Sequence, residues 1–395
     1  MNLNPVGWAS SSLRLVARLF NSGVNRTVPV TAISEAPISM VNADIALVAK
    51  GTGAILAQVP DGDVAAGNKR GTSAVDWQKE RSSNTQVASG SNSVIGGGGS
   101  NTASSGMATI AGGQLNLASG QYSAITGGYN NTASTNYSTV GGGQSNTAST
   151  NTHATVVGGN SNTASGQYSF VGGGGSNVAS SSYAFVGGGF SNTASTSVNA
   201  SVVGGNGNTA SGNYSFIGGG ESHIANANHS VVLGGYSGTT RSIAGYSVFP
   251  AHSQTLSGAQ GVVQSALLLL ARETTDATAT VLASNQSAAS TTNQVILPNN
   301  SAYFFKGSCI AGVTGAGNTK AWEFKGAIKR GATAGSTAIV GSVIKDVIAS
   351  DSGASAWDIT ITADTTNGGI AVTVTGQAAT TIRWVCKIET TEMTY

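Results

Sequence analysis

The sequence contains little charge and no long apolar segment. It has 18 basic and 16 acidic side chains among 395 residues, or 9% of the chain, where soluble globular proteins average about 25%. No basic cluster exceeds a pair of residues, so there is no electrostatic footprint for nucleic acid or an anionic membrane. The longest aliphatic run, residues 266–271, is far shorter than the roughly 20 residues of a membrane helix. We therefore expect neither nucleic-acid binding nor membrane insertion.

Proline and cysteine are also scarce. Six prolines beside 56 glycines, without a Gly-X-Y period, exclude a collagen triple helix. The two cysteines, Cys309 and Cys386, are too few for a disulfide-stapled scaffold or a zinc site, and we expect two buried thiols. Residues 1–23 lack the pattern of a secretory leader, which predicts synthesis in the cytoplasm.

The missing charge is concentrated in one stretch. Residues 91–240 contain a single charged side chain, Glu221, together with 33 of the 56 glycines. A unit that begins Asn-Thr-Ala-Ser, or a close variant, recurs there every 15 or 16 residues, and a degenerate ninth unit begins at His223. The eight regular units begin at Asn101, Asn116, Asn131, Asn146, Asn162, Asn177, Asn192 and Asn208.

Each unit repeats one pattern of apolar residues. An alanine lies two positions after the start, a valine or isoleucine follows near position ten, and glycines close most units. Two short strands per unit predict a parallel β-solenoid, because stacking buries a face that no single unit can bury. Identical side chains then lie about 4.8 Å apart, so repetition penalises charge and favours ladders of Asn, Ser and Thr.

The short repeat also predicts an assembly. A 15-residue coil encloses little more than one Ala and one Val or Ile, and nine coils make a rod of only roughly 43 Å. A single rod of this kind is thin. We therefore expect identical chains to pack around an axis as a homotrimer, which would cover the second strand of each coil, as in residues 168–171 and 214–217.

More ordinary sequence flanks the repeats. Residues 12–21 place apolar side chains on one helical stripe, and residues 44–82 alternate turn signals with short apolar runs. After Pro250 the charge recovers, and eight or nine alternating runs predict a β-sandwich or jelly roll. We expect an N-terminal region at 1–83, repeats at 84–240, a linker at 241–258 and the sandwich at 259–395.

No catalytic constellation is evident. A glycosidase needs two carboxylates, and the repeats supply one per chain. Three acids of the sandwich, Asp351, Asp358 and Asp364, are expected to be solubilising charges on turns or outward positions. His223 and His229 share the ninth unit and are expected in surface or stacked polar positions, with an axial ion site as the alternative. We therefore predict no enzyme, no catalytic residue, no cofactor and no bound metal.

The repeats resemble a known family. The unit Asn162-Thr-Ala-Ser-Gly-Gln-Tyr-Ser-Phe-Val-Gly-Gly-Gly174 is similar to the head repeats of trimeric autotransporter adhesins, the YadA-like β-roll, which also occur in phage tail fibres. The segments Lys320-Ala-Trp-Glu-Phe324 and Thr381-Ile-Arg-Trp-Val385 resemble the C-terminal domains of phage tail fibres. The resemblance implies a virion tail fibre whose N-terminal region attaches to the tail or baseplate and whose C-terminal domain binds the host surface.

The implied mechanism is multivalent, non-covalent adhesion to a host glycan or another outer-membrane component. Loop residues Arg330, Asp364 and Asn367 are the predicted receptor contacts, because loops expose polar groups that strands do not. Three alternatives stay open: a tailspike-type polysaccharide depolymerase, a bacterial trimeric surface adhesin, and an ice-binding solenoid whose threonines recur on one face.

Overall fold

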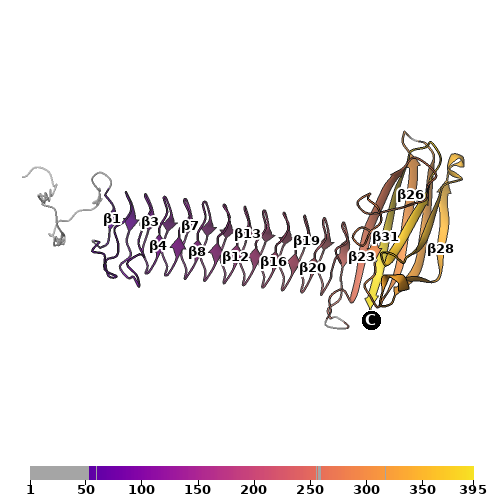
Figure 1. The fold of residues 1–395 in the computed structure, drawn as a ribbon. Helices are drawn as coiled ribbons and strands as arrows, with labels where there is room; N and C mark the ends of the chain where they lie inside the picture. The colour runs from indigo at the N-terminus through magenta and orange to yellow at the C-terminus, as the bar shows by residue number, and fades with distance from the viewer. Residues whose placement is uncertain (1–52, 59, 255, 257–258, 316) are drawn as a thin grey trace, which may run out of the picture. The chain divides into compact units, whose positions relative to one another are not determined.

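The structure, a computed structural model, describes residues 53–395 except 59, 255, 257–258 and 316. This part is all-β, with two single-turn 3-10 segments, η1 (Ala334–Ser336) and η2 (Ser352–Ala354). It contains a parallel β-solenoid followed by antiparallel sheets, as the sequence predicts (Figure 1). The helix predicted at 12–21 and most of the predicted N-terminal region lie outside the described residues. Among the residues that are described, no helix is long and apolar enough to span a membrane.

Two parallel ladders and a row of single bridges form the solenoid. The first ladder contains β1 (Ile55–Leu56), β2 (Val75–Asp76), β3 (Val94–Ile95), β5 (Thr109–Ile110), β7 (Ala124–Ile125), β9 (Thr139–Val140), β11 (Thr155–Val156), β13 (Phe170–Val171), β15 (Phe185–Val186), β17 (Ser201–Val202), β19 (Phe216–Ile217), β21 (Val231–Val232) and β22 (Ser247–Phe249). The second contains β4 (Thr102–Ala103), β6 (Leu117–Ala118), β8 (Thr132–Ala133), β10 (Thr147–Ala148), β12 (Thr163–Ala164), β14 (Val178–Ala179), β16 (Thr193–Ala194), β18 (Thr209–Ala210) and β20 (Ile224–Ala225). The first ladder starts before the regular repeats and ends after them, so it extends about 58 Å at 4.8 Å per step.

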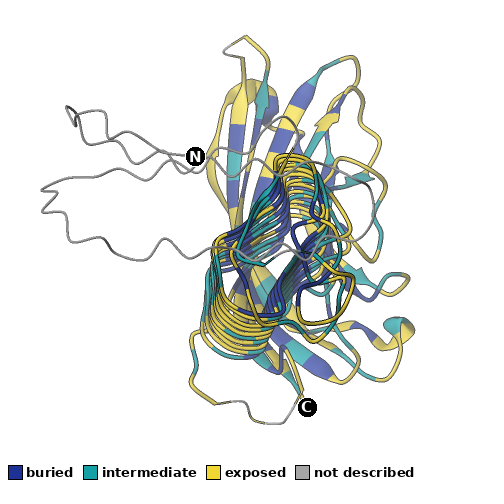
Figure 2. Cartoon of the chain, turned by 90° about the vertical axis from the view of Figure 1, so that its left-hand side faces the viewer, coloured by how far each residue is buried: buried dark blue, intermediate teal, exposed yellow. Residues whose placement is uncertain are grey.

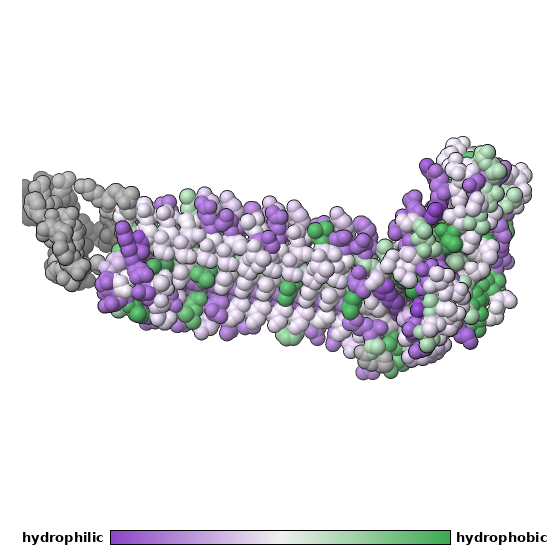
Figure 3. Space-filling view, in the orientation of Figure 1, coloured by the Kyte–Doolittle hydropathy of each residue, from purple (hydrophilic) through white to green (hydrophobic). Residues whose placement is uncertain are grey.

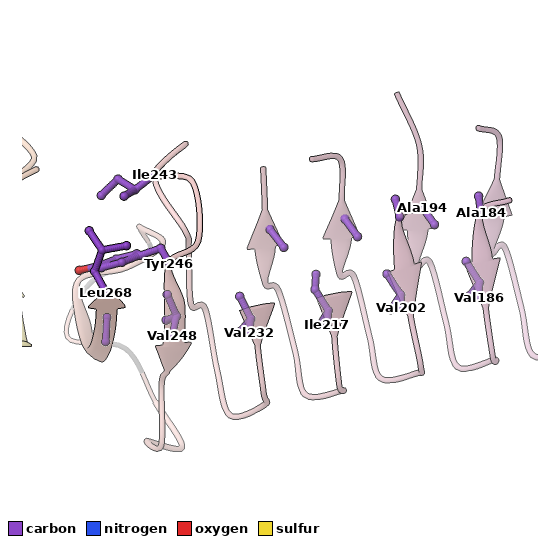
Figure 4. Close-up of a cluster of buried hydrophobic side chains, with 14 of the residues drawn as sticks. Ala184, Val186, Ala194, Val202, Ile217, Val232, Ile243, Tyr246, Val248 and Leu268 are labelled. Atoms are coloured by element: carbon purple, nitrogen blue, oxygen red, sulfur yellow. The ribbon is translucent and has the colours of Figure 1, made fainter. Parts of the chain in front are cut away.

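The solenoid core consists of the two apolar positions of each repeat. The alanine of one ladder and the valine or isoleucine of the other are fully buried in coil after coil, as Ala194 and Val202 illustrate (Figures 2 and 4). Each core residue pairs in register with its equivalent in the next coil. The predicted core of one small and one branched side chain per coil is confirmed.

A ladder of buried asparagines fills the rest of the interior. The first residue of each regular repeat is buried, as at Asn162, whose Nδ2 donates to the carbonyls of Gly158 and Gly174, both at 2.9 Å. Its Oδ1 accepts the backbone N–H of Asn177 in the next coil at 2.9 Å. Stacked amides therefore satisfy buried backbone groups of neighbouring coils, which explains why this position repeats so strictly.

The amide ladder ends in different side chains. At its start Gln78, which is buried, accepts the backbone N–H of Asn101 through Oε1 at 2.8 Å. At its end His223 replaces the asparagine: Nδ1 accepts the N–H of Gly238 at 2.8 Å, and Nε2 donates to the carbonyl of Gly235 at 3.1 Å. Burial lowers the pKa of His223, so the neutral ring suits this position.

Glycines make the tight corners between strands. Gly128 has a φ of 88°, and a Cβ there would overlap the carbonyl oxygen of Gly143 in the next coil. Only glycine allows coils to approach this closely.

Buried ion pairs occur at both ends of the solenoid. At the first coils Asp76 receives Arg70 Nε at 2.8 Å and Arg81 Nη2 at 3.3 Å. At the last coil Arg241 Nη1 lies 2.8 Å from Glu392 of the C-terminal sheet, and Tyr246 donates to the same carboxylate. Asp76 escapes like-charge stacking because its partners in the ladder are the apolar residues Leu56 and Ile95.

Two antiparallel sheets follow the solenoid directly, since β22 pairs with β23. The large sheet has the order β23 (Val263–Thr274), β31 (Ile382–Thr394), β26 (Ser301–Val313), β27 (Thr319–Arg330) and β28 (Ala338–Ser350). The small sheet contains β24 (Thr280–Val281), β25 (Val295–Ile296), β29 (Asp358–Asp364) and β30 (Gly369–Thr375). The C-terminal region thus contains nine strands, β23 to β31, where the sequence predicts eight or nine.

The two sheets share a tryptophan-rich core. Trp384 of the large sheet stacks on Trp322 at 5.8 Å between ring centroids and contacts Trp357, which precedes β29, at 6.2 Å. Cys309 and Cys386 are cross-strand partners in this core and are free, buried thiols, as predicted. A hydrogen bond with Cys309, together with burial, raises the pKa of the Cys386 thiol.

Candidate functional site

The outer face of the large sheet is open over much of its area. One face packs on the small sheet, whereas the other exposes apolar side chains at alternate positions. These exposed residues include Leu269, Phe304, Ile310, Val340 and Val385. An uncovered face of this kind has room for a ligand or another chain.

A charged hollow of about 270 Å³ lies in the middle of this face. Two rows of cross-strand neighbours from β31, β26, β27 and β28 form it. The first row is Glu389, Lys306, Lys325 and Ile344, and the second is Lys387, Ser308, Glu323 and Asp346. Three lysines and three carboxylates therefore meet on a surface that is otherwise mostly apolar.

The charges of this hollow are not all paired. Lys387 Nζ lies 2.7 Å from Glu389 and Lys306 Nζ 2.9 Å, and hydrogen bonds from these two lysines hold the pKa of Glu389 below its usual value. Glu323 and Asp346, in contrast, form no ion pair with any described residue. β27 and β28 place these two acids directly opposite each other, although three lysines line the same hollow.

Two carboxylates on directly opposite residues destabilise a sheet, but a pair of carboxylates can also perform acid–base catalysis. Cβ atoms of directly opposite residues lie about 4.5 to 5.5 Å apart, and the two carboxyl groups used in glycoside hydrolysis lie about 5 to 9.5 Å apart, so the paired positions of Glu323 and Asp346 suit such a pair. In the described part of the chain, no group of three His, Cys, Asp or Glu side chains is arranged to hold a metal ion.

The sequence does not single out this site. Glu323 and Lys325 are predicted as outward residues of one run, and Lys387 and Glu389 as outward residues of another, but the order of the strands brings these runs together. One feature of the sequence does point to it: several strands that otherwise expose apolar side chains carry charged residues at outward positions.

The structure brings the three predicted receptor contacts to one end of the domain. Arg330 ends β27 and donates through Nη1 to the carbonyl of Leu297 at 2.6 Å, while its guanidinium lies against Gly368. Asp364 ends β29, accepts the backbone N–H of Asn367 at 2.9 Å and accepts its Nδ2 at 2.8 Å. These bonds stabilise the β29–β30 turn. Receptor contact by Arg330, Asp364 and Asn367 stays a prediction.

The other acids singled out by sequence have structural partners. Asp351 Oδ2 accepts the N–H of Thr319 at 2.8 Å, and Asp358 forms an ion pair with Lys345 at 2.8 Å. Of the two histidines of the ninth unit, His229 stacks on Tyr214 with ring centroids 5.0 Å apart, and His223 is buried at the end of the amide ladder. His153 also stacks, on Tyr137 at 4.8 Å.

Comparison with known proteins finds solved structures of phage tailspikes, whereas no family model and no curated protein matches the chain. The tailspike protein of Acinetobacter baumannii phage AM24 is 8% identical with a TM-score of 0.23, covering 80% of this chain and 67% of the other. The tailspike of Acinetobacter phage vB_ApiP_P1 is 11% identical, with a TM-score of 0.21 and coverage of 87% and 74%. A tailspike from A. baumannii bacteriophage Fri1, named a capsular polysaccharide depolymerase, is 6% identical, with a TM-score of 0.20 and coverage of 81% and 61%.

These structures correct one prediction made from the sequence. The sequence predicts that the chain is not an enzyme, but the neighbours are tailspikes and one is named as a depolymerase, which is an enzyme. The prediction of a non-enzymatic protein is therefore wrong. That prediction rests on the acids of the repeats and of the turns, whereas the structure pairs two further acids, Glu323 and Asp346, on neighbouring strands.

Proposed function

We propose that the chain is a bacteriophage tail protein of the tailspike type, which binds a polysaccharide of the host surface and cleaves it. The main support for this proposal is the hollow in which Glu323 and Asp346 lie opposite each other and form no ion pair with any described residue. The solenoid would hold this domain at a fixed distance, with the N-terminal region attached to the virion tail. The YadA-like character of the repeats belongs to this proposal and is not needed for the chemistry.

The cleavage we propose is hydrolysis of a glycosidic bond. The protonated member of the Glu323–Asp346 pair donates its proton to the glycosidic oxygen, and the C–O bond breaks as the other carboxylate attacks the sugar carbon or activates a water molecule. Lys325, which has no ion pair among the described residues, is placed to hold an oxygen of the sugar. Phe304 and Ile310, exposed on the same face, offer apolar surface to the sugar rings.

The test uses purified capsular polysaccharide of the host bacterium and the full chain. We expect the wild-type protein to release reducing ends, and Glu323→Gln or Asp346→Asn to lower the rate by about 100-fold or more. Glu273→Gln is the matched control, since Glu273 is an exposed acid of the same sheet that pairs with Arg383 at 3.0 Å. Its rate should stay within about twofold of wild type.

Two results would count against this proposal. If neither carboxylate variant loses activity, the hollow is not the site of cleavage. If the wild-type protein binds the polysaccharide and releases no reducing ends, hydrolysis is wrong.

A homotrimer forms the second part of the proposal. On the outward side of the first ladder Phe170 and Phe185 stack at 5.5 Å, and Val203 and Leu233 are exposed directly after two further strands of the same ladder, β17 and β21. In a charge-poor solenoid, this apolar row supports packing against identical chains. Light scattering of the purified full chain should give three times the mass of one chain, and a monomeric mass at micromolar concentration would overturn this part.

A further inference from the structure

A stack of aromatic rings runs along one corner of the solenoid. It begins with Tyr122, Tyr137, His153, Tyr168 and Tyr183, whose successive ring centroids lie 5.0, 4.8, 4.7 and 5.3 Å apart. Asn199 occupies the equivalent position of the next coil, after which Tyr214 and His229 resume the stack at 5.0 Å. We call this set of seven rings the aromatic ladder.

The aromatic ladder is exposed, unlike a stabilising core. Its tyrosines retain between 41% and 55% of their accessible surface. The rings cover one another's faces, so the edges and hydroxyl groups face solvent. Within the described residues, none of the five tyrosine hydroxyls forms a hydrogen bond. A row of unused hydroxyl groups therefore follows the solenoid at the spacing of its coils.

The backbone conformation at these positions is energetically unfavourable for tyrosine. Every ladder position has a positive φ, 59° at Tyr122 and 56° at Tyr168, a region where asparagine and glycine fit better than aromatic residues. The chain itself places Asn199 at one of these positions, which demonstrates that the coil closes without a ring. Folding alone therefore does not account for tyrosine in five of the coils.

The surroundings specify the chemistry of a partner. Residues 91–240 carry only Glu221 as a charge, and much of the solenoid surface is neither strongly hydrophilic nor strongly hydrophobic (Figure 3). Amides and hydroxyls lie beside the ladder, since Gln121, Asn136, Thr152 and Gln167 directly precede its rings. A charged polymer finds no counter-charge here, whereas a hydroxyl-rich chain finds donors and acceptors at regular intervals and aromatic edges between them.

We propose that the aromatic ladder is a second binding site, which holds an extended, uncharged stretch of the host polysaccharide parallel to the solenoid axis. The inference rests on the proposed function for the identity of the ligand, but it does not depend on cleavage. If so, one chain binds the polysaccharide at two places, on the solenoid and at the hollow. Binding at the solenoid then raises the effective concentration of glycosidic bonds near Glu323 and Asp346.

The test compares ring removal with hydroxyl removal in the full chain. The double variant Tyr137→Asn/Tyr168→Asn copies the natural Asn199, so the coils should keep their geometry, and Tyr137→Phe/Tyr168→Phe removes only the hydroxyls. The probe is a size-fractionated oligosaccharide of the host capsule, measured by calorimetry with Asp346→Asn present throughout to prevent cleavage. We expect the affinity to fall about tenfold in the Asn double variant and by less in the Phe double variant.

The matched control is Tyr129→Gln. Tyr129 is also exposed, at 43%, but it lies in the row of single bridges, where Gln114 and Gln144 occupy the neighbouring coils. The Tyr129→Gln variant should bind the oligosaccharide with the same affinity as the protein that carries Asp346→Asn alone. Binding at the ladder should also resist added salt, because no charge takes part, whereas binding at the hollow should weaken.

Each outcome decides one question. Unchanged affinity in the Asn double variant overturns the ladder site, whatever happens to hydrolysis. A change in the oligomeric mass of that variant, measured by light scattering, would make the ladder a contact between subunits and would also overturn the proposal. If hydrolysis fails while the ladder variants still lose affinity, the proposed cleavage is wrong and the second site stands.

Discussion

The buried amide ladder allows a sharp test of how the solenoid is held together. Asn162 is fully buried and forms three side-chain hydrogen bonds, each 2.9 Å long, to Gly158, Gly174 and the N–H of Asn177. In Asn162→Ala all three bonds disappear at once. The change concerns the contact between adjacent coils and leaves the apolar core of Ala and Val untouched.

The expected cost follows from what each lost bond leaves behind. In the variant the buried backbone N–H of Asn177 loses the acceptor Oδ1, which costs about 1 to 3 kcal/mol of stability. The loss of the two bonds that Nδ2 donates costs about 0.5 to 1.5 kcal/mol each. We therefore expect Asn162→Ala to destabilise the solenoid by about 4 kcal/mol, a large part of the 5 to 15 kcal/mol typical of a domain. Because each coil contacts only its neighbours, the loss should be local.

Hydrogen exchange under native conditions measures this effect coil by coil. Amides of residues 158–177 should exchange faster by about two to three orders of magnitude, while those near β22 keep the wild-type rate. Asn160→Ala is the control, since Asn160 is exposed and water can replace the bond that its Nδ2 donates to Gln144 Oε1 at 3.3 Å. If both variants exchange alike, the amide ladder does not stabilise the coils and this account of the repeat is wrong.

Three further predictions concern other parts of the molecule. Burial keeps the pKa of His223 below the usual 6.5, so stability should fall as the pH drops below about 6.5, and His223→Asn should flatten that dependence in pH-resolved unfolding. Gly128→Ala should lower the melting temperature by several degrees, while Gly112→Ala, with open space around its Cβ, leaves it unchanged. Glu392→Gln removes the buried charge that pairs with Arg241, so limited proteolysis should cut the connection between the solenoid and the sheets about tenfold faster; an unchanged rate would refute this role.

The repeat made the solenoid predictable. A strict period of 15 or 16 residues, with Ala and Val or Ile in phase, allows parallel stacking and little else, and the structure has those residues in register. The strands of the C-terminal domain could also be predicted, because the alternation of apolar and polar residues along a strand indicates which side chains share a face. Most of the predicted N-terminal region lies outside the described residues, and the four-region division of the chain stays a prediction.

The candidate site could not be predicted in the same way. Alternation gives the face of Glu323, Lys325, Lys387 and Glu389, but not which strands are neighbours. The order β23, β31, β26, β27, β28 places the last strand of the chain between two earlier ones, so Glu389 and Lys306 meet across 83 positions of sequence. A hydrogen-bonded sheet fixes these neighbours through the backbone, and the backbone carries no residue-specific code for partner choice.

The sequence by itself determined the solenoid, the absence of charge within it and the alternating strands that follow, because these depend on short periods that repeat along the chain. The tertiary structure alone decided that Gln78 and His223 end the amide ladder, that tyrosines and histidines form an exposed stack interrupted at Asn199, and that Glu323 is paired with Asp346. Each of these depends on which segments lie side by side, and that is set by closure of the coils and the order of the strands in the sheet.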